Sequence, residues 1–251
     1  MNEYINLSME NIENEHICCA IGDPKHQNGV ECKKEWIKSK LEEGHVFRKL
    51  NARGKTFIEY EPLETAWVPI SGNNYEYIYC LWVAGSFKDK GIGKELLQYA
   101  INDSKEKGRK GICTLVSKKK KPFLGEKKFF EHFGFKIVDS IGDYELLALQ
   151  FEKGETPKFN DSARTMKIKS LDFTIYYSNE CPYVEYEVKE LSDYANENNI
   201  KIDFIKIDSL EKAKKAPCIF NNWANFYKGN FISNTILNAN ALEKILKRLD
   251  S

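Results

Sequence analysis

The stretch from Tyr77 to Ala100, YIYCLWVAGSFKDKGIGKELLQYA, constrains the fold of this chain more than any other. Tyr77 to Val83 is almost continuously aromatic, β-branched or apolar, which is typical of a strand covered on both faces. After Gly91 the apolar residues recur at helical spacing, so a helix is expected to begin near the turn Gly91-Ile92-Gly93. The stretch therefore predicts a buried strand, a glycine-bearing turn and an amphipathic helix.

This turn is suited to hold a phosphate group. Gly91 and Gly93 leave no Cβ over the neighbouring backbone amides, and amides at a helix N-terminus have no intrahelical partner, so they attract anions. Positive charge is added by three lysines, Lys88, Lys90 and Lys94. The dinucleotide fingerprint and the Walker loop both fit poorly, because Leu96 stands where the first has glycine and Glu95 where the second has Ser or Thr.

The hexapeptide KDKGIG resembles the acyl-CoA signature [QR]-x-x-G-x-[GA] of the GCN5-related N-acetyltransferases (GNAT). The resemblance implies that the strand before the turn holds the pantetheine arm through its main chain and that the turn amides hold the pyrophosphate. The residues expected to bind acetyl-CoA are Leu81, Trp82, Val83, Lys88, Asp89, Lys90, Gly91, Ile92, Gly93 and Lys94. Lys88 departs from the signature, because it has the charge of Arg without the planar fork.

A second phrase, FFEHFGF at residues 129–135, resembles the end of the fourth GNAT helix, F-Y-E-K-x-G-F. Many members use the Tyr of that phrase to protonate the departing CoA thiolate, whereas this chain has Phe130. Another group, water or an unassisted departure would then be needed, and Tyr77, Tyr79 and Cys80 are possible substitutes. The two phrases imply an α/β (α+β) GNAT domain over residues 1–152, a mixed sheet flanked by helices.

Acyl transfer to an amine needs a group that removes a proton from the amine and donors for the carbonyl oxygen. The strand amides near Leu81 to Val83 are the expected donors. The candidate catalytic side chains are Glu59, Glu61, Tyr79 and Cys80, with Glu76 and His45 behind them. An alternating Glu on a strand is also typical of a solvated face, so both interpretations stay open. The lysine run at 118–121 is either a solvated loop or an attractor of the adenosine 3'-phosphate.

Residues 153–168 have few apolar side chains and read as a linker to a smaller domain over residues 169–251. The expected order in that domain is βαβ followed by ββα, which resembles the thioredoxin fold. Cys181-Pro182-Tyr183-Val184 stands where glutaredoxins have C-P-Y-C, and Ala216-Pro217 where the thioredoxin fold keeps a cis-proline. The tail from Ala216 onward resembles the YoaP-type domain found with one branch of GNAT enzymes.

Cys181 matches the nucleophilic cysteine of glutaredoxins, but its resolving partner is replaced by Val184. A helix N-terminus would favour the Cys181 thiolate. Cys218 is a conceivable second redox thiol if the fold brings the two within disulfide reach. A scaffold or substrate-shaping role for the domain is the alternative.

The net charge, the polar N-terminus and the cysteine content exclude several classes of protein. The formal net charge is +1 over 251 residues, which does not favour a nucleic-acid or membrane surface. The polar N-terminus and the lack of a long apolar run make a cytoplasmic protein the expectation. Seven scattered cysteines without a C-x-x-C pair argue against a disulfide framework or a zinc site, and no metal is expected.

The leading hypothesis is an acetyl-CoA-dependent N-acetyltransferase that modifies a primary amine of a small molecule or peptide. The alternative is an acyl-CoA-binding, thiol-based redox or sensing protein that acts through Cys181.

Overall fold

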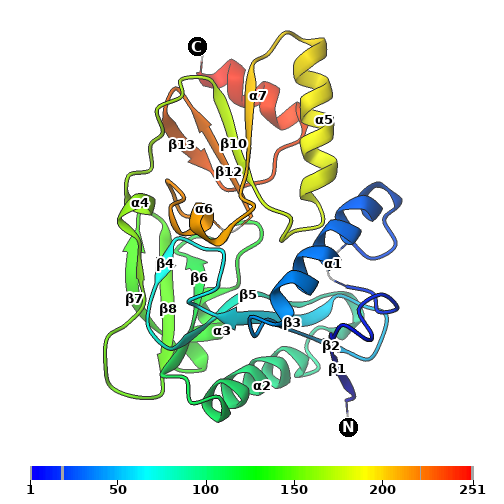
Figure 1. Cartoon of the computed structure of the whole chain (residues 1–251), viewed down its shortest axis with the longest axis vertical. Coiled ribbons are helices and arrows are strands. Elements are labelled where there is room, and N and C mark those ends of the chain that lie inside the picture. Colours follow the sequence, from blue (N-terminus) through cyan, green and yellow to red (C-terminus); the bar gives the residue numbers. More distant parts are fainter. Residues whose placement is uncertain (1, 18–19, 221, 250–251) are drawn as a thin grey trace.

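The computed structural model describes residues 2–17, 20–220 and 222–249 (Figure 1). Cys18 and Cys19 lie outside the described residues. None of the described helices combines the length and the apolar character needed to cross a membrane.

The larger part of the chain is built on a seven-stranded sheet with the order β1-β2-β3-β5-β6-β8-β7. Its strands are β1 (Tyr4–Asn6), β2 (Val46–Leu50), β3 (Thr56–Pro62), β5 (Tyr75–Val83), β6 (Gly111–Ser117), β7 (Lys136–Ile141) and β8 (Tyr144–Gln150). The pairing of β5 with β6 is parallel, and the other neighbouring pairs are antiparallel. The residues predicted as a buried strand, Tyr77 to Val83, lie within β5 at the middle of this sheet.

Helices cover both faces of this sheet (Figure 1). They are α1 (Gln27–Leu41), α2 (Ile92–Glu106) and α3 (Lys127–His132), with short 3-10 turns η1 (Pro24–His26) and η2 (Gly85–Phe87). Side chains of β5 alternate between two cores: Tyr77 packs with Trp36 of α1, whereas Ile78 packs with Leu96 of α2. A strand covered on both faces is what the continuous apolar run predicted.

The segment that reads as a linker contains regular structure. Strand β9 (Lys158–Phe159) pairs with β4 (Ile70–Ser71), and α4 (Asp161–Arg164) follows. Phe159 and Ala163 are buried in the same core cluster as Ile70, so these two apolar side chains fix a segment of polar composition. The segment predicted as a linker is therefore ordered and packed at these elements.

A second sheet of four strands has the order β11-β10-β12-β13. Its elements are β10 (Phe173–Tyr177), α5 (Val184–Glu197), β11 (Ile202–Lys206), α6 (Leu210–Lys214), β12 (Trp223–Tyr227), β13 (Asn230–Ser233) and α7 (Ala239–Leu249). β10 pairs parallel with β11 and antiparallel with β12, as the βαβ–ββα order predicts. Helix α6 is an addition to that order, and β12 begins at Trp223.

Packing joins the two parts closely. Helix α1 lies against α5, and the ring of His26 meets the ring of Tyr183 edge-on, with 4.6 Å between centroids. Lys214 of α6 donates hydrogen bonds to the carbonyl oxygens of Leu63 at 2.7 Å and Ile70 at 2.9 Å. Burial lowers the pKa of Lys214 to about 8. The small domain is thus held by charged hydrogen bonds as well as by apolar contact.

Candidate functional site

A fork between β5 and β6 creates the site. The parallel pairing runs from Tyr75 and Gly111 to Ile78 and Thr114 and then stops, although β5 continues to Val83. The Thr114 hydroxyl donates to the carbonyl oxygen of Ile78 at 3.1 Å at the point of divergence. On its other edge β5 stays paired with β3 as far as Val83.

A bulge in β5 lies at the fork. Glu59 pairs with Cys80 and Tyr60 with Ile78, so Tyr79 is an extra residue in the ladder. A bulge bends its strand and disrupts the local ladder. The stretch from Tyr79 to Val83 therefore turns one edge of its main chain toward open space instead of toward β6.

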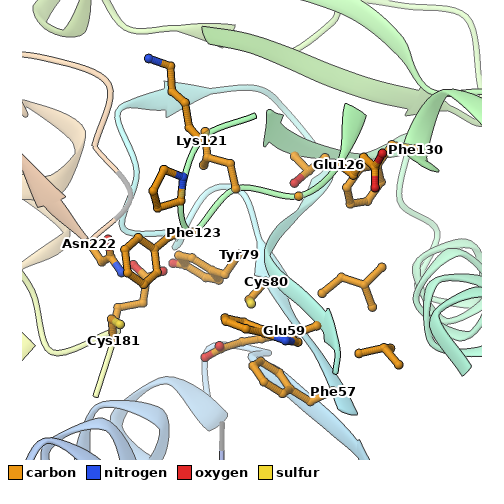
Figure 2. A pocket seen from close by; sticks show the side chains of 18 of the residues that line it. Phe57, Glu59, Tyr79, Cys80, Lys121, Phe123, Glu126, Phe130, Cys181 and Asn222 are labelled. Atoms are coloured by element: carbon orange, nitrogen blue, oxygen red, sulfur yellow. The ribbon is translucent and has the colours of Figure 1, made fainter. Parts of the chain in front are cut away.

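This open space is a cavity of about 360 Å³ (Figure 2). Its wall includes, from the larger domain, Lys33, Phe57, Glu59, Tyr79, Cys80, Leu81, Trp82, Val83, Lys88, Thr114, Phe130 and residues 120–126, and, from the smaller domain, Glu180, Cys181, Pro182 and Asn222. Both domains thus contribute to one cavity.

The expected acyl-CoA residues divide into two groups. Leu81, Trp82, Val83 and Lys88 lie in the cavity wall, whereas residues 89–94 lie outside it and lead into α2. Gly91 is the N-cap of α2 and has a left-handed φ of 78°, and a Cβ added there would meet no atom within 4 Å. The first turn of α2 is thus approachable from solvent, and the exposed Lys88, Lys90 and Lys94 surround it. A cavity that leads to an open helix N-terminus fits an extended thiol ester that ends in phosphates.

Glu59 and Glu61 lie in a buried charged cluster beneath α1, not on a solvated face. Lys33 Nζ is 2.9 and 2.7 Å from the two carboxylate oxygens of Glu59. The ring of His45 joins the two glutamates: Nε2 is 3.2 Å from Glu59 Oε1 and Nδ1 is 3.2 Å from Glu61 Oε2. The Tyr79 hydroxyl donates to Glu61 and accepts from the Trp67 amide at 2.7 Å.

The cluster sets the charges of its members. Burial alone would raise the pKa of Glu59, but Lys33 and His45 outweigh it and hold that pKa below its usual range. Burial would lower the pKa of His45, yet the bonds to Glu59 and Glu61 raise it. Burial, with the charge of Glu61, raises the pKa of Tyr79 well above 10. Glu59 is therefore a weak base here, and only Glu59, Tyr79 and Cys80 of the four candidate catalytic residues reach the cavity.

Glu76 lies away from the cavity, in an ion pair with Arg109. Burial raises the pKa of Glu76 to about 7, despite the opposing charge of Arg109. Phe130 is buried in the cavity wall and offers no proton, as expected from its side chain. Lys120 and Lys121 of the lysine run also line the cavity.

The two candidate redox thiols are in different surroundings. Cys181 packs in the core between the small sheet and α5, whereas Cys218 is fully buried on the other side of that sheet. Burial raises the pKa of Cys218 above that of an ordinary thiol. No disulfide joins any two of the five described cysteines, and the peptide bond before Pro217 is trans, unlike the expected cis-proline.

Glu180 is a residue of the site that the sequence reasoning missed. It precedes the C-P-Y motif at the junction between β10 and α5, and it lies in the cavity wall with 5% of its surface exposed. Burial raises the pKa of its carboxyl group well above the usual value. Its position next to Cys181 was the only available signal, because no periodicity marks a residue in such a loop.

Two family models match parts of this chain. Residues 53–137 match the model of the acetyltransferase (GNAT) domain, and residues 201–244 match the YoaP-like model. The chain is 38% identical to the uncharacterized N-acetyltransferase YoaP of Bacillus subtilis (strain 168) over 248 residues, which cover 98% of this chain and 99% of that protein.

Solved structures similar to this chain are GNAT proteins. One is a GNAT family acetyltransferase from Brucella melitensis in complex with acetyl-CoA, at 13% identity and a TM-score of 0.41, covering 64% of this chain and 94% of that one. Another is the PaiA N-acetyltransferase from Thermoplasma acidophilum in complex with coenzyme A. The similarity covers 60% of this chain and 99% of that one, at 19% identity and a TM-score of 0.43. From the similarity to YoaP over nearly its whole length, the chain belongs to the YoaP-like GNAT N-acetyltransferases.

Proposed function

We propose that this protein transfers the acetyl group of acetyl-CoA to a primary amine in the cavity at the β5–β6 fork. The observation that carries the proposal is the unpaired edge of β5 beyond Ile78, which leads to the open N-terminus of α2. The strand edge offers main-chain groups to an extended arm, and the helix end offers amides to a phosphate. The acceptor amine belongs to a small molecule or a peptide.

Each part of the site has a task in the transfer. Main-chain amides from Leu81 to Val83 stabilise the negative charge that develops on the thioester oxygen. The new C–N bond forms as the C–S bond breaks, and the ammonium of the acceptor must lose a proton before it attacks. Lys88, Lys90 and Lys94 hold the phosphates. Glu59 is kept ionised by Lys33, and the bond between them holds this part of the cavity wall in place.

Among the candidate catalytic residues, Cys80 is half-buried at the centre of the cavity, where it would lie close to the departing thiolate (Figure 2). Glu61 and Tyr79 bind each other, so they orient the cluster instead of exchanging protons with the acceptor. The C-terminal domain has the strand order of a thioredoxin-like fold, which we propose for it.

Calorimetric titration with acetyl-CoA and with dephospho-CoA tests the proposal. We expect micromolar binding of acetyl-CoA that weakens without the 3'-phosphate. Gly91→Ala should reduce this affinity, because a side chain at φ 78° strains the backbone that presents the amides. Gly108→Ala is the matched control: its φ is 67° and its Cβ would also meet no atom within 4 Å, but it follows the far end of α2. Failure of the wild-type protein to bind acetyl-CoA would contradict the proposal.

A further inference from the structure

The carboxyl group of Glu180 is an unusual feature of the cavity wall. Only 5% of the residue is exposed, and its Oε2 atom has no hydrogen-bond partner among the residues that the structure describes. Buried polar atoms without partners are rare in native proteins, because leaving one unsatisfied costs about 1–3 kcal/mol. A group of this kind in a cavity is expected to bind a ligand that donates a hydrogen bond.

The main chain holds Glu180 firmly in place. Lys33 Nζ donates to the carbonyl oxygen of Glu180 at 2.6 Å, while the same ammonium binds both oxygens of Glu59. The Lys33 ammonium thus binds the Glu59 carboxylate and the main-chain oxygen of Glu180. The side chain of Glu180 is left to face the cavity.

The residues around Glu180 make its carboxyl group a stronger base than the carboxyl group of Glu59 or that of an exposed glutamate. The ionisable groups that face it are Lys33 from α1, Glu59 and Glu61 from β3, Tyr77 and Tyr79 from β5, and the neighbouring Cys181. Burial first, and then the two glutamates, raise its pKa, with only Lys33 opposing them. General bases work best when their pKa is near the working pH.

The two ends of the cavity differ in character (Figure 2). Cys181, Phe123 and Asn222 lie together at one end, whereas Phe130 and Glu126 lie at the other. Glu180 directly precedes Cys181 in the chain and lines the same cavity. The wall also includes aromatic and aliphatic side chains, among them Phe57, Trp82, Phe123 and Leu124.

We propose that Glu180 binds the amino group of the acceptor and takes the proton that its ammonium loses, so that the C-terminal domain supplies the acceptor side of the active site. The acceptor is a primary amine on an apolar or aromatic body, which the wall can cover. The ammonium becomes a neutral amine as the carboxylate becomes a carboxylic acid. The amine then forms the C–N bond, the thiolate leaves, and the amide nitrogen loses a second proton that neutralises the thiolate. This inference rests on the proposed function.

Phenethylamine and hydroxylamine serve as acceptor probes. Phenethylamine is a cation at neutral pH and needs a base, whereas hydroxylamine is already neutral. Glu180→Gln should lower kcat/KM for phenethylamine by about 10²- to 10⁴-fold and that for hydroxylamine by much less. In the wild type, kcat/KM for phenethylamine should fall as the pH is lowered through the pKa of Glu180. The pH profile of Glu180→Gln should lack this low-pH decrease.

Glu187→Gln is the matched control. Glu187 lies on α5, and burial also raises its pKa, but it is not in the cavity wall. This variant should keep wild-type rates. Calorimetry with acetyl-CoA separates the two proposals, because Glu180→Gln should bind acetyl-CoA as the wild type does.

Equal losses with the two probes, or an unchanged low-pH limb in Glu180→Gln, would overturn the role of Glu180 as a base. Binding of acetyl-CoA by a wild-type protein that fails to acetylate phenethylamine would overturn the assigned acceptor class and leave the proposed function standing.

Discussion

Lys33 of α1 donates a 2.6 Å hydrogen bond to the carbonyl oxygen of Glu180, 147 residues later in the chain. The same ammonium holds the Glu59 carboxylate on β3. One side chain therefore ties the central sheet of the larger domain to the strand–helix junction of the smaller one. The relative position of the two walls of the cavity depends on this contact.

Replacing Lys33 should destabilise the protein strongly. Lys33→Met would leave Glu59 as a buried charge without its main partner, and breaking a buried pair in this way typically costs about 3–5 kcal/mol. Urea unfolding of wild type and variant measures the loss. Lys212→Met is the control, since Lys212 and Asp208 form an exposed pair. Equal effects of the two substitutions would contradict the importance of the buried cluster.

Stability should depend on pH through His45. Its folded-state pKa is raised by Glu59 and Glu61, so its contribution is fully present below its ordinary pKa of about 6.5 and is lost as the pH rises through the raised value. His45→Gln should remove this loss of stability at rising pH. Lys214 contributes the opposite slope, because burial lowers its pKa to about 8.

The difference in unfolding free energy between wild type and His45→Gln, measured from about pH 6 to pH 9, isolates the histidine. This difference should shrink as the pH rises. A difference that stays constant would show that the pKa of His45 is not raised in the folded protein.

Gly29 is required for the docking of α1 on the small domain. A Cβ at Gly29 would lie 1.9 Å from the carbonyl oxygen of Pro182, so the backbone must move apart. We expect Gly29→Ala to lower the free energy of unfolding by about 1–3 kcal/mol. It should also speed the reaction of Cys181, which is 7% exposed, with a thiol reagent.

Peptide mapping identifies the modified cysteine in that experiment. Gly154→Ala is the control, since its Cβ would meet nothing within 4 Å. Unchanged Cys181 reactivity in Gly29→Ala would mean that α1 adapts without opening the junction.

Cys181→Ser distinguishes amine acetylation from a thiol-based activity. The two cysteines of the small domain lie in separate cores, and the serine hydroxyl nearly matches the size of the thiol. We expect acetyl transfer to phenethylamine to change by less than about tenfold, which is below the loss assigned to a general base. A loss as large as that in Glu180→Gln would favour a function centred on the thiol.

Local patterns were sufficient for most of the secondary structure. The apolar run of β5, the glycine turn and the spacing in α2 identified the strand–turn–helix unit. The packing of residues 153–168 could not be predicted, because composition reports an average, whereas the two buried side chains Phe159 and Ala163 order the segment. Glu59 and Glu61 were predicted as candidate catalytic residues on a strand, but their burial depends on α1, which is distant in sequence.

The sequence by itself determined the family, the fold class and the glycine turn before α2, because these depend on contiguous motifs and on periodicity within single elements. Only the tertiary structure decided the composition of the cavity. The fork between β5 and β6 opens it, and the docking of α5 against α1 brings Glu180 to its wall. Burial and nearby charges set the proton affinity of Glu59, His45 and Glu180, and both are properties of residues that meet only in the folded chain.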